Sequence, residues 1–292
     1  MDAMVLPMVT VARSNRSQLS QNVFERREKK YLMTPVQYTC FMQQVHEQFV
    51  EDEYPRSLIL SIYYDTPDHR MIRRSSEKPL YKEKIRVRSY GEAGADDPVF
   101  VELKKKYRGV VYKRRLRCSR RAAECFLAGM PYEQAVTSFP MNDMLDDRSN
   151  AETGTSRLQD EALSARSCQI AHEITETRMR YGLIIPSMMI ITDRVALHTR
   201  DDAIRITFDL EPQWRTSDLT FEQSFEGTPL LPEGETIMEI KCLDAYPLWL
   251  VHALNVSRLY PTACSKYERA FTQSQKIEDG RTWRCANEGD NR

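Results

Sequence analysis

The chain has 292 residues, of which 41% are hydrophobic and 29% are charged, a composition typical of a soluble globular protein. Its 42 basic residues equal its 42 acidic residues, which argues against a protein coated for nucleic acid or for a membrane surface. No run approaches the roughly 18 apolar residues of a transmembrane helix. The seven cysteines include no C-x-x-C pair, so we expect reduced thiols in a cytoplasmic protein.

Eight segments have the alternation or the β-branched content of strands, and four have helical patterns. In chain order, the predicted strands are residues 24–33, 58–66, 80–90, 98–107, 110–117, 188–199, 203–211 and 235–243. The predicted helices are residues 35–49, 68–76, 119–128 and 246–257. Pro35 suits the first turn of its helix, and Gly109 suits a tight turn between the fourth and fifth strands.

Charged residues alternate with apolar ones along these strands. The segment KEKIRVRSYG (82–91) places Lys82, Lys84, Arg86 and Arg88 at every second position, so four cations share one face of a strand. The same alternation recurs at Glu28 and Lys30, Glu102 and Lys104, Lys113 and Arg115, Arg205, Thr207 and Asp209, and Glu239 and Lys241. Between residues 70 and 121, 18 Lys and Arg stand against 6 Asp and Glu. This local excess predicts a focused anion site.

The strand pattern predicts an α+β fold with an eight-stranded antiparallel β-barrel. We expect the helices to cover the apolar outside of the barrel, so that the charged faces line a polar and basic tunnel. Like charges that face one another repel unless anions lie between them, which points to a chain of phosphates as ligand. The carboxylates of Glu28, Glu102 and Glu239 would either pair with these cations or hold a divalent metal.

Eight short motifs occur in a fixed order along the chain. They are RREKKY (26–31), YYDTPD (63–68), KEKIRVRSYG (82–91), VFVELKKK (99–106), VVYKRR (110–115), DRVALHT with IRITFD (193–209), IMEIKC (237–242) and SKYERAF (265–271). This ordered set resembles the VTC-type polyphosphate polymerase domain of the triphosphate tunnel metalloenzyme (CYTH-like) superfamily. The resemblance covers residues 23–272, which we expect to form a tunnel domain. The composition of the remaining segments predicts a flexible arm (1–22), a variable polar insertion (141–165) within the domain, and a flexible tail (273–292).

The resemblance implies transfer of the γ-phosphate of ATP to a growing polyphosphate chain, with Mn²⁺ or Mg²⁺ as cofactor. It implies catalytic roles for Lys30, Arg86, Arg88 and Lys266. It implies phosphate binding by Lys84, Lys104, Lys113, Arg115, Arg194, Arg205, Lys241 and Ser265. Glu239 matches the metal-binding glutamate of the family, and Glu28 and Glu102 are further candidate metal ligands.

One departure from the wider superfamily separates the expected activities. Hydrolases and cyclases of the superfamily begin with Glu-x-Glu-x-Lys, whereas this chain has Arg26-x-Glu28-x-Lys30, as in the polymerase branch. We therefore expect a polyphosphate polymerase. A hydrolase of tripolyphosphate or nucleoside triphosphates, or a polyphosphate-binding module, is the alternative. The expected partners are ATP and polyphosphate or triphosphate rather than nucleic acid, and association with a membrane partner protein and the oligomeric state stay open.

Overall fold

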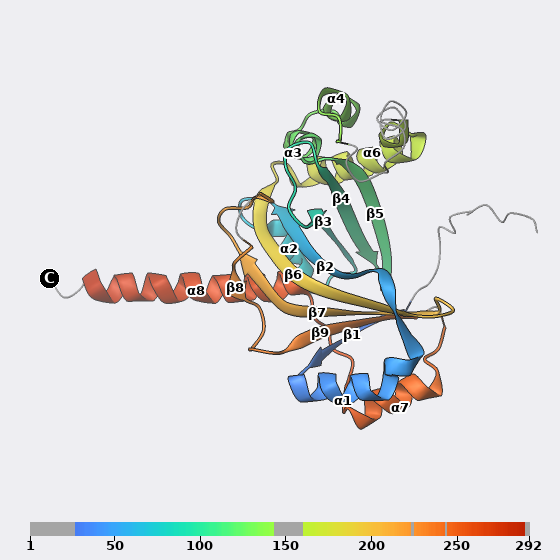
Figure 1. Ribbon diagram of the computed structural model, residues 1–292. Helices are drawn as coiled ribbons and strands as arrows, with labels where there is room; N and C mark the ends of the chain where they lie inside the picture. The colour runs from blue at the N-terminus through green and yellow to red at the C-terminus, as the bar shows by residue number, and fades with distance from the viewer. Residues whose placement is uncertain (1–26, 143–159, 223–224, 243, 290–292) are drawn as a thin grey trace, which may run out of the picture.

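The computed structural model describes residues 27–142, 160–222, 225–242 and 244–289 (Figure 1). The expected arm (1–22) and residues 143–159 of the expected insertion lie outside these ranges. The strands are β1 (Arg27–Met33), β2 (Phe49–Asp65), β3 (Tyr81–Tyr90), β4 (Pro98–Tyr107), β5 (Val110–Ser119), β6 (Ile185–Thr199), β7 (Ile204–Arg215), β8 (Thr228–Pro229) and β9 (Thr236–Cys242). The helices include α1 (Pro35–Val45), α2 (Arg70–Ser76), α3 (Arg120–Ala128), α4 (Tyr132–Ser138), α6 (Ala165–Tyr181), α7 (Leu248–Val256) and α8 (Lys266–Gly289), with a short 3-10 helix at His46–Gln48.

All nine strands belong to one antiparallel sheet in the order β1-β9-β7-β6-β2-β3-β4-β5, with β8 beside β7. This order starts at β1 and ends at β5, and no ladder joins these two strands within the described residues. The closed eight-stranded barrel expected from the sequence is therefore not confirmed. The observed fold is an antiparallel sheet with helices, in which β2 and β6 bend between an upper group of strands, β3 to β5, and a lower group, β7, β9 and β1 (Figure 1).

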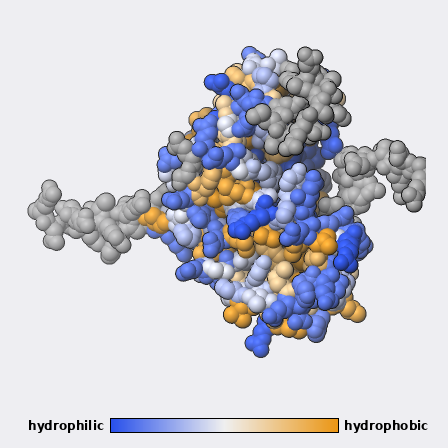
Figure 2. All heavy atoms as spheres, viewed as in Figure 1, coloured by the Kyte–Doolittle hydropathy of each residue, from blue (hydrophilic) through white to orange (hydrophobic). Residues whose placement is uncertain are grey.

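Helices α1, α3, α4, α6 and α7 cover the convex face of this bent sheet, where the sequence predicted that helices would lie. Apolar side chains of β2, β3, β4 and β5 pack with α3, α4 and α6, and those of β1, β7 and β9 pack with α1 and α7. Ile85, Val87 and Val101 are buried in the first cluster, whereas Phe208 and Ile240 are buried in the second. In Figure 2, hydrophobic residues gather in the middle of the side that is turned toward the viewer, between the two groups of helices.

Local sequence fixes the start of two of these helices. Thr34 caps α1 in a capping box with Gln37, and Pro35 occupies the first helical turn. Ser119 caps α3 by accepting a hydrogen bond from the backbone N–H of Ala122 at 3.1 Å. Gly109 has φ +91° at the turn between β4 and β5, a conformation that favours glycine.

Helix α8 begins on the concave face and covers one end of it. Tyr267 and Ala270 of α8 pack against Tyr63, Ile190 and Trp214 in a third apolar cluster. The buried carboxylate of Asp65 accepts hydrogen bonds from the Tyr267 hydroxyl and from the backbone of α2, which ties the two helices to the end of β2. Helix α8 continues to residue 289, through most of the segment expected as a flexible tail. None of the described helices has the length and apolar character needed to cross a membrane.

Candidate functional site

The concave face of the sheet, called the trough below, carries the alternating cations predicted from the sequence. Lys84, Arg86 and Arg88 of β3 lie on this face, and the intervening Ile85 and Val87 are buried on the convex side. The register continues this pattern across the sheet. Arg86 lies opposite Glu102, which lies opposite Arg115, and the next row is Lys84, Lys104 and Lys113.

Glu102 is the centre of a cluster of four cations. Its side chain is only 2% exposed and lies 2.6 Å from Arg86, 2.7 Å from Arg115, 2.9 Å from Lys113 and 3.9 Å from Arg88. Burial would raise the pKa of Glu102, but these positive charges hold it well below its usual range. A single carboxylate cannot neutralise four cations, so this part of the trough keeps a positive charge.

Asp209 of β7 forms a second buried centre. Arg194 of β6 donates two hydrogen bonds to its carboxylate, at 2.6 and 2.9 Å, and Lys266 at the start of α8 contacts the same group. Burial would raise the pKa of Asp209, whereas Lys266 and Arg194 lower it well below its usual value. Asp209 was not among the candidate residues, although its alternation with Arg205 and Thr207 had placed it on the charged face.

Glu239 of β9 forms the third centre. Its carboxylate lies 3.0 Å from Lys30 of β1 and 2.8 Å from Lys241, and Lys30 is also 3.7 Å from Glu28. Burial opposes ionisation of Glu239, but Lys30 and Lys241 keep its pKa well below the usual range. The structure thus brings these four candidate residues together on one wall of the trough.

Two lysines of the trough have no carboxylate partner in the part of the chain that the structure describes. Lys84 donates to the Ser265 hydroxyl at 3.1 Å and lies 5.6 Å from the centre of the Tyr267 ring. Burial lowers the pKa of Lys84 and of Lys104. The charge of Glu28 on β1 raises the pKa of Lys104 and that of Lys30 lowers it, so these side chains are near enough to interact electrostatically.

Arg205 lies at the margin of this arrangement. Its guanidinium pairs with Asp52 of β2 at 2.8 Å, and its side chain is 53% exposed. It lies opposite Lys241 in the β7–β9 register, but it is already paired with the carboxylate of Asp52. It is therefore the predicted phosphate-binding residue least integrated with the others.

Tyr63 is a feature of the trough that the candidate residues did not include. Its hydroxyl accepts a hydrogen bond from Arg86 at 3.0 Å, and its ring stacks on Tyr267 at 4.2 Å. Burial would raise the pKa of Tyr63, but the charges of Arg86, Lys84 and Arg88 together lower it to about 7. The motif YYDTPD placed a tyrosine here, but the sequence did not show which cations would surround it.

The trough carries more positive than negative charge. Its ten cations are Lys30, Lys84, Arg86, Arg88, Lys104, Lys113, Arg115, Arg194, Lys241 and Lys266, and its four carboxylates are Glu28, Glu102, Asp209 and Glu239. The excess of six positive charges, set in a partly buried concave face, suits a ligand with several negative charges.

The three candidate metal ligands differ in how well they fit a metal ion. Four cations enclose Glu102. They leave little room for a divalent metal ion at this carboxylate, and their positive charges would repel it. Glu239 and Glu28 both contact Lys30 and offer oxygen ligands on one wall. Mg²⁺ is commonly held by one or two carboxylates together with substrate phosphates. Across the described ranges no group of three or more His, Cys, Asp or Glu side chains is arranged to hold a metal, so phosphate oxygens would have to complete such a site.

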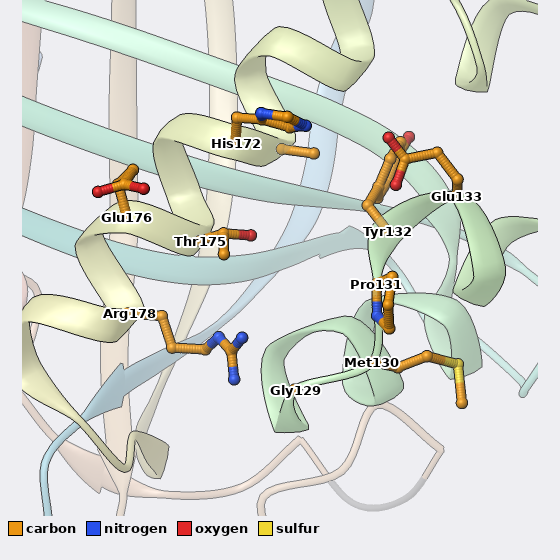
Figure 3. A pocket seen from close by; sticks show the side chains of 10 residues that line it. Gly129, Met130, Pro131, Tyr132, Glu133, His172, Thr175, Glu176 and Arg178 are labelled. Atoms are coloured by element: carbon orange, nitrogen blue, oxygen red, sulfur yellow. The ribbon is translucent and has the colours of Figure 1, made fainter.

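A separate cavity of about 270 Å³ lies outside the trough, between α6 and the segment that joins α3 to α4. Figure 3 shows Arg178 of α6 pointing toward Gly129, where α3 ends. A cation at this position interacts favourably with the C-terminal end of a helix. None of the predicted site residues lines this cavity.

Comparison with known proteins gives one family match. The family model described as VTC domain matches residues 25–274. No curated protein matches the chain. Matching solved structures include a Vibrio parahaemolyticus protein described provisionally as an adenylate cyclase, with 10% sequence identity and a TM-score of 0.40. That match covers 86% of this chain and 99% of the other, and at this similarity it carries no argument about function.

Proposed function

The chain belongs to the VTC-domain family, and from this premise we propose that it is an ATP-dependent polyphosphate polymerase. The reaction would transfer the γ-phosphate of ATP to the end of a polyphosphate chain lying in the trough. The observation that carries this proposal is the excess of six positive charges on the concave face. Phosphate chains are the ligands that best match such a surface, because each phosphate unit brings negative charge and several hydrogen-bond acceptors.

The cations of the trough differ in whether a carboxylate of the protein already pairs with them. Arg86 and Arg88 present guanidinium groups that can bind phosphate oxygens through two hydrogen bonds. Lys84 and Lys104 form no salt bridge with the described residues that would have to break first, so we propose that they contact phosphate from the outset. Lys266, held by Asp209 at the start of α8, would bind phosphate at the end of the trough that α8 covers.

Phosphoryl transfer depends mainly on positioning and on stabilising negative charge. The acceptor is itself a phosphate and is ionised at neutral pH, so the reaction needs no general base. A divalent metal ion on Glu239 and Glu28, completed by phosphate oxygens, would supply neutralisation of the charge that develops on the leaving diphosphate. The residues of this chain would hold both substrates in line and keep the phosphate oxygens paired with cations.

The test is incubation of the pure protein with ATP and Mn²⁺, followed by separation of the products on a gel. A ladder of long phosphate chains is the expected result. Release of free phosphate alone would indicate a hydrolase with the same trough, and unchanged ATP would indicate a binding module.

Two neighbouring lysines provide a matched pair of variants for this assay. Lys104 faces the trough, whereas Lys105 faces the convex side and pairs with Glu173 at 3.1 Å. Lys104→Ala should lower chain synthesis at least tenfold, because one charged hydrogen bond to phosphate is worth about 1.5–3 kcal/mol. Lys105→Ala should keep synthesis near the wild-type rate. Equal effects of the two variants would contradict the assignment of the trough as the active site.

A further inference from the structure

An aromatic group lies at the end of the trough that is remote from α8. Tyr90 ends β3 on the same face as Arg86 and Arg88, and its side chain is 48% exposed. The other end of β3 is near α8, where Lys84 contacts Ser265. Tyr90 is six residues farther along the strand, or about 20 Å at the usual rise per residue. Tyr90 and α8 therefore mark opposite ends of the row of cations.

Tyr90 belongs to a compact group with Phe100 and Arg115. The rings of Tyr90 and Phe100 meet edge to face, with centroids 5.7 Å apart. The Arg115 guanidinium lies 4.3 Å from the centre of the Phe100 ring and donates a hydrogen bond to the Tyr90 hydroxyl at 3.2 Å. Because Arg115 also pairs with Glu102, the aromatic group is joined directly to the main cluster of cations.

Binding a bare phosphate chain requires cations and hydrogen-bond donors, but it gives no reason for a half-exposed tyrosine, packed on a second aromatic ring, beside them. The rings of nucleobases stack on aromatic side chains and on the planes of arginine side chains. A nucleoside triphosphate has both parts, a row of phosphates and a flat base at one end. The order of groups along the trough, from lysines and arginines to aromatic rings, matches the order of groups along that ligand.

We propose that Tyr90, Phe100 and Arg115 form a platform on which the base of a nucleoside triphosphate stacks, while its phosphates extend along the trough toward α8. The proposal rests on the proposed function for the binding of the triphosphate part and adds the location of the nucleoside. Every base can stack on such a platform, so it should not distinguish adenine from guanine strongly. Purines should bind more tightly than pyrimidines, because their larger rings cover more of the platform.

The experiment compares the affinities of ATP, CTP and tripolyphosphate by calorimetry, at pH 6.5 and without divalent metal so that no turnover occurs. Tyr90→Ala should weaken ATP binding by about tenfold, since stacking of one base contributes about 1–3 kcal/mol, whereas its affinity for tripolyphosphate should stay within about twofold of wild type. Tyr90→Phe should keep most of the affinity for ATP, because the ring and not the hydroxyl supports the base. CTP should lose less affinity than ATP in Tyr90→Ala.

Tyr112→Ala is the matched control, because Tyr112 is 45% exposed and lies on β5 outside the aromatic group. It should bind ATP and tripolyphosphate as the wild type does. If Tyr90→Ala binds ATP as tightly as the wild type and still binds tripolyphosphate, the platform is wrong and the trough function stands. If neither the wild type nor any variant binds tripolyphosphate, the proposed function itself is wrong, and the platform, which depends on it, is wrong as well. An equal loss of ATP and tripolyphosphate affinity in Tyr90→Ala would show that Tyr90 acts on the phosphates or on the fold, and would also overturn the platform.

Discussion

Two buried glutamates lie on opposite faces of the β3–β4 pair, and they differ in how many cations they meet. On the convex face, the side chain of Glu83 is fully buried and pairs with Arg180 at 2.7 Å, with hydrogen bonds from Tyr81 and Thr177. On the trough face, Glu102 meets four cations. The arrangement around Glu83 is balanced within the fold, whereas the cations around Glu102 outnumber the carboxylate and leave positive charge for an external anion to neutralise.

This difference separates structural from functional charge in one small region. A buried ion pair is weak evidence for function, because the removal of either partner is costly whatever its role. An excess of one sign is stronger evidence, because self-repulsion is unfavourable unless a ligand relieves it. The predictions below therefore compare the two faces, with and without a polyanion.

The largest effect should come from Glu102→Gln. Removing the carboxylate that these four buried or half-buried cations share should destabilise the ligand-free protein by about 3–5 kcal/mol. Tripolyphosphate should restore much of this loss, because its oxygens can replace the missing carboxylate. Glu83→Gln should also destabilise the protein, yet tripolyphosphate should stabilise it no more than it stabilises the wild type. Chemical denaturation with and without tripolyphosphate measures the free energy of unfolding of both variants. Equal recovery of the two variants would refute the proposed difference between the trough face and the convex face.

The pH dependence of this first prediction follows from the depressed pKa of Glu102. The carboxylate has a lower pKa in the folded than in the unfolded state, so its stabilising contribution is complete above the unfolded value of about 4.3. It is lost progressively as the pH falls toward the folded value. The difference in stability between the wild type and Glu102→Gln should therefore be constant near neutrality and should shrink below about pH 4.

The second prediction concerns the trough as a whole. A ligand that binds only the folded state stabilises it by about 2.7 kcal/mol at a hundredfold excess over its dissociation constant. Millimolar tripolyphosphate should therefore raise the melting temperature by several degrees, and by far more than sulfate at equal ionic strength. An exposed basic surface would respond to ionic strength alone, since such charges are screened over about 10 Å. Equal shifts with the two anions would rule out the trough as a polyanion site.

The third prediction separates paired from unpaired cations within the trough. Arg86→Ala should destabilise the ligand-free protein by about 1–3 kcal/mol, because Glu102 and Tyr63 lose a charged hydrogen-bond donor. Lys104→Ala should leave stability unchanged or slightly raised, because it removes repulsion and breaks no ion pair. Both variants should bind tripolyphosphate more weakly. A large loss of stability in Lys104→Ala would mean that this lysine is held by the fold.

The sequence predicted the strands better than the helices. The predicted segments overlap all eight long strands, although β2 begins at Phe49 and not at residue 58. Alternation indicated the charged face of most of them, because a two-residue period is visible within seven to ten residues. Helix α6 was missed, although its buried residues Ile170, Ile174, Thr177 and Tyr181 recur at spacings of three and four. Strand β8 is only two residues long and leaves no periodic signal. Helix α8 was missed because SKYERAF was interpreted as a motif and not as the start of a helix.

The site residues could be predicted by face but not by partner. Alternation placed Lys30, Glu102 and Glu239 on the charged side, since that follows from each strand alone. The pairing of Asp209 with Lys266, 57 residues away, and the approach of Lys104 to Glu28 and Lys30 of β1 depend on how far the sheet bends. The bend brings together strands that are far apart in the sequence, so it could not be predicted from the alternation within any single strand. The open ends of the sheet at β1 and β5 were unforeseen for the same reason.

The smallest effect should appear at Tyr63 and Tyr64, adjacent tyrosines on opposite faces of β2. The trough cations lower the pKa of Tyr63 to about 7, whereas burial raises the pKa of Tyr64 on the convex side. Burial would raise the pKa of Tyr90, but Arg115 and Arg88 lower it to about 8, so this residue contributes a second transition. A near-ultraviolet titration of tyrosinate should therefore show a transition near pH 7, below that of Tyr90, that is absent in Tyr63→Phe and retained in Tyr64→Phe. Because the folded pKa of Tyr63 lies below its unfolded value of about 10, its stabilising contribution is complete above pH 10 and is lost as the pH falls through 7.

Tripolyphosphate should move the transition of Tyr63 to higher pH, since bound phosphate neutralises the cations that favour the phenolate. A transition that tripolyphosphate leaves unmoved would place the polyanion outside the cluster of Arg86, Lys84 and Arg88.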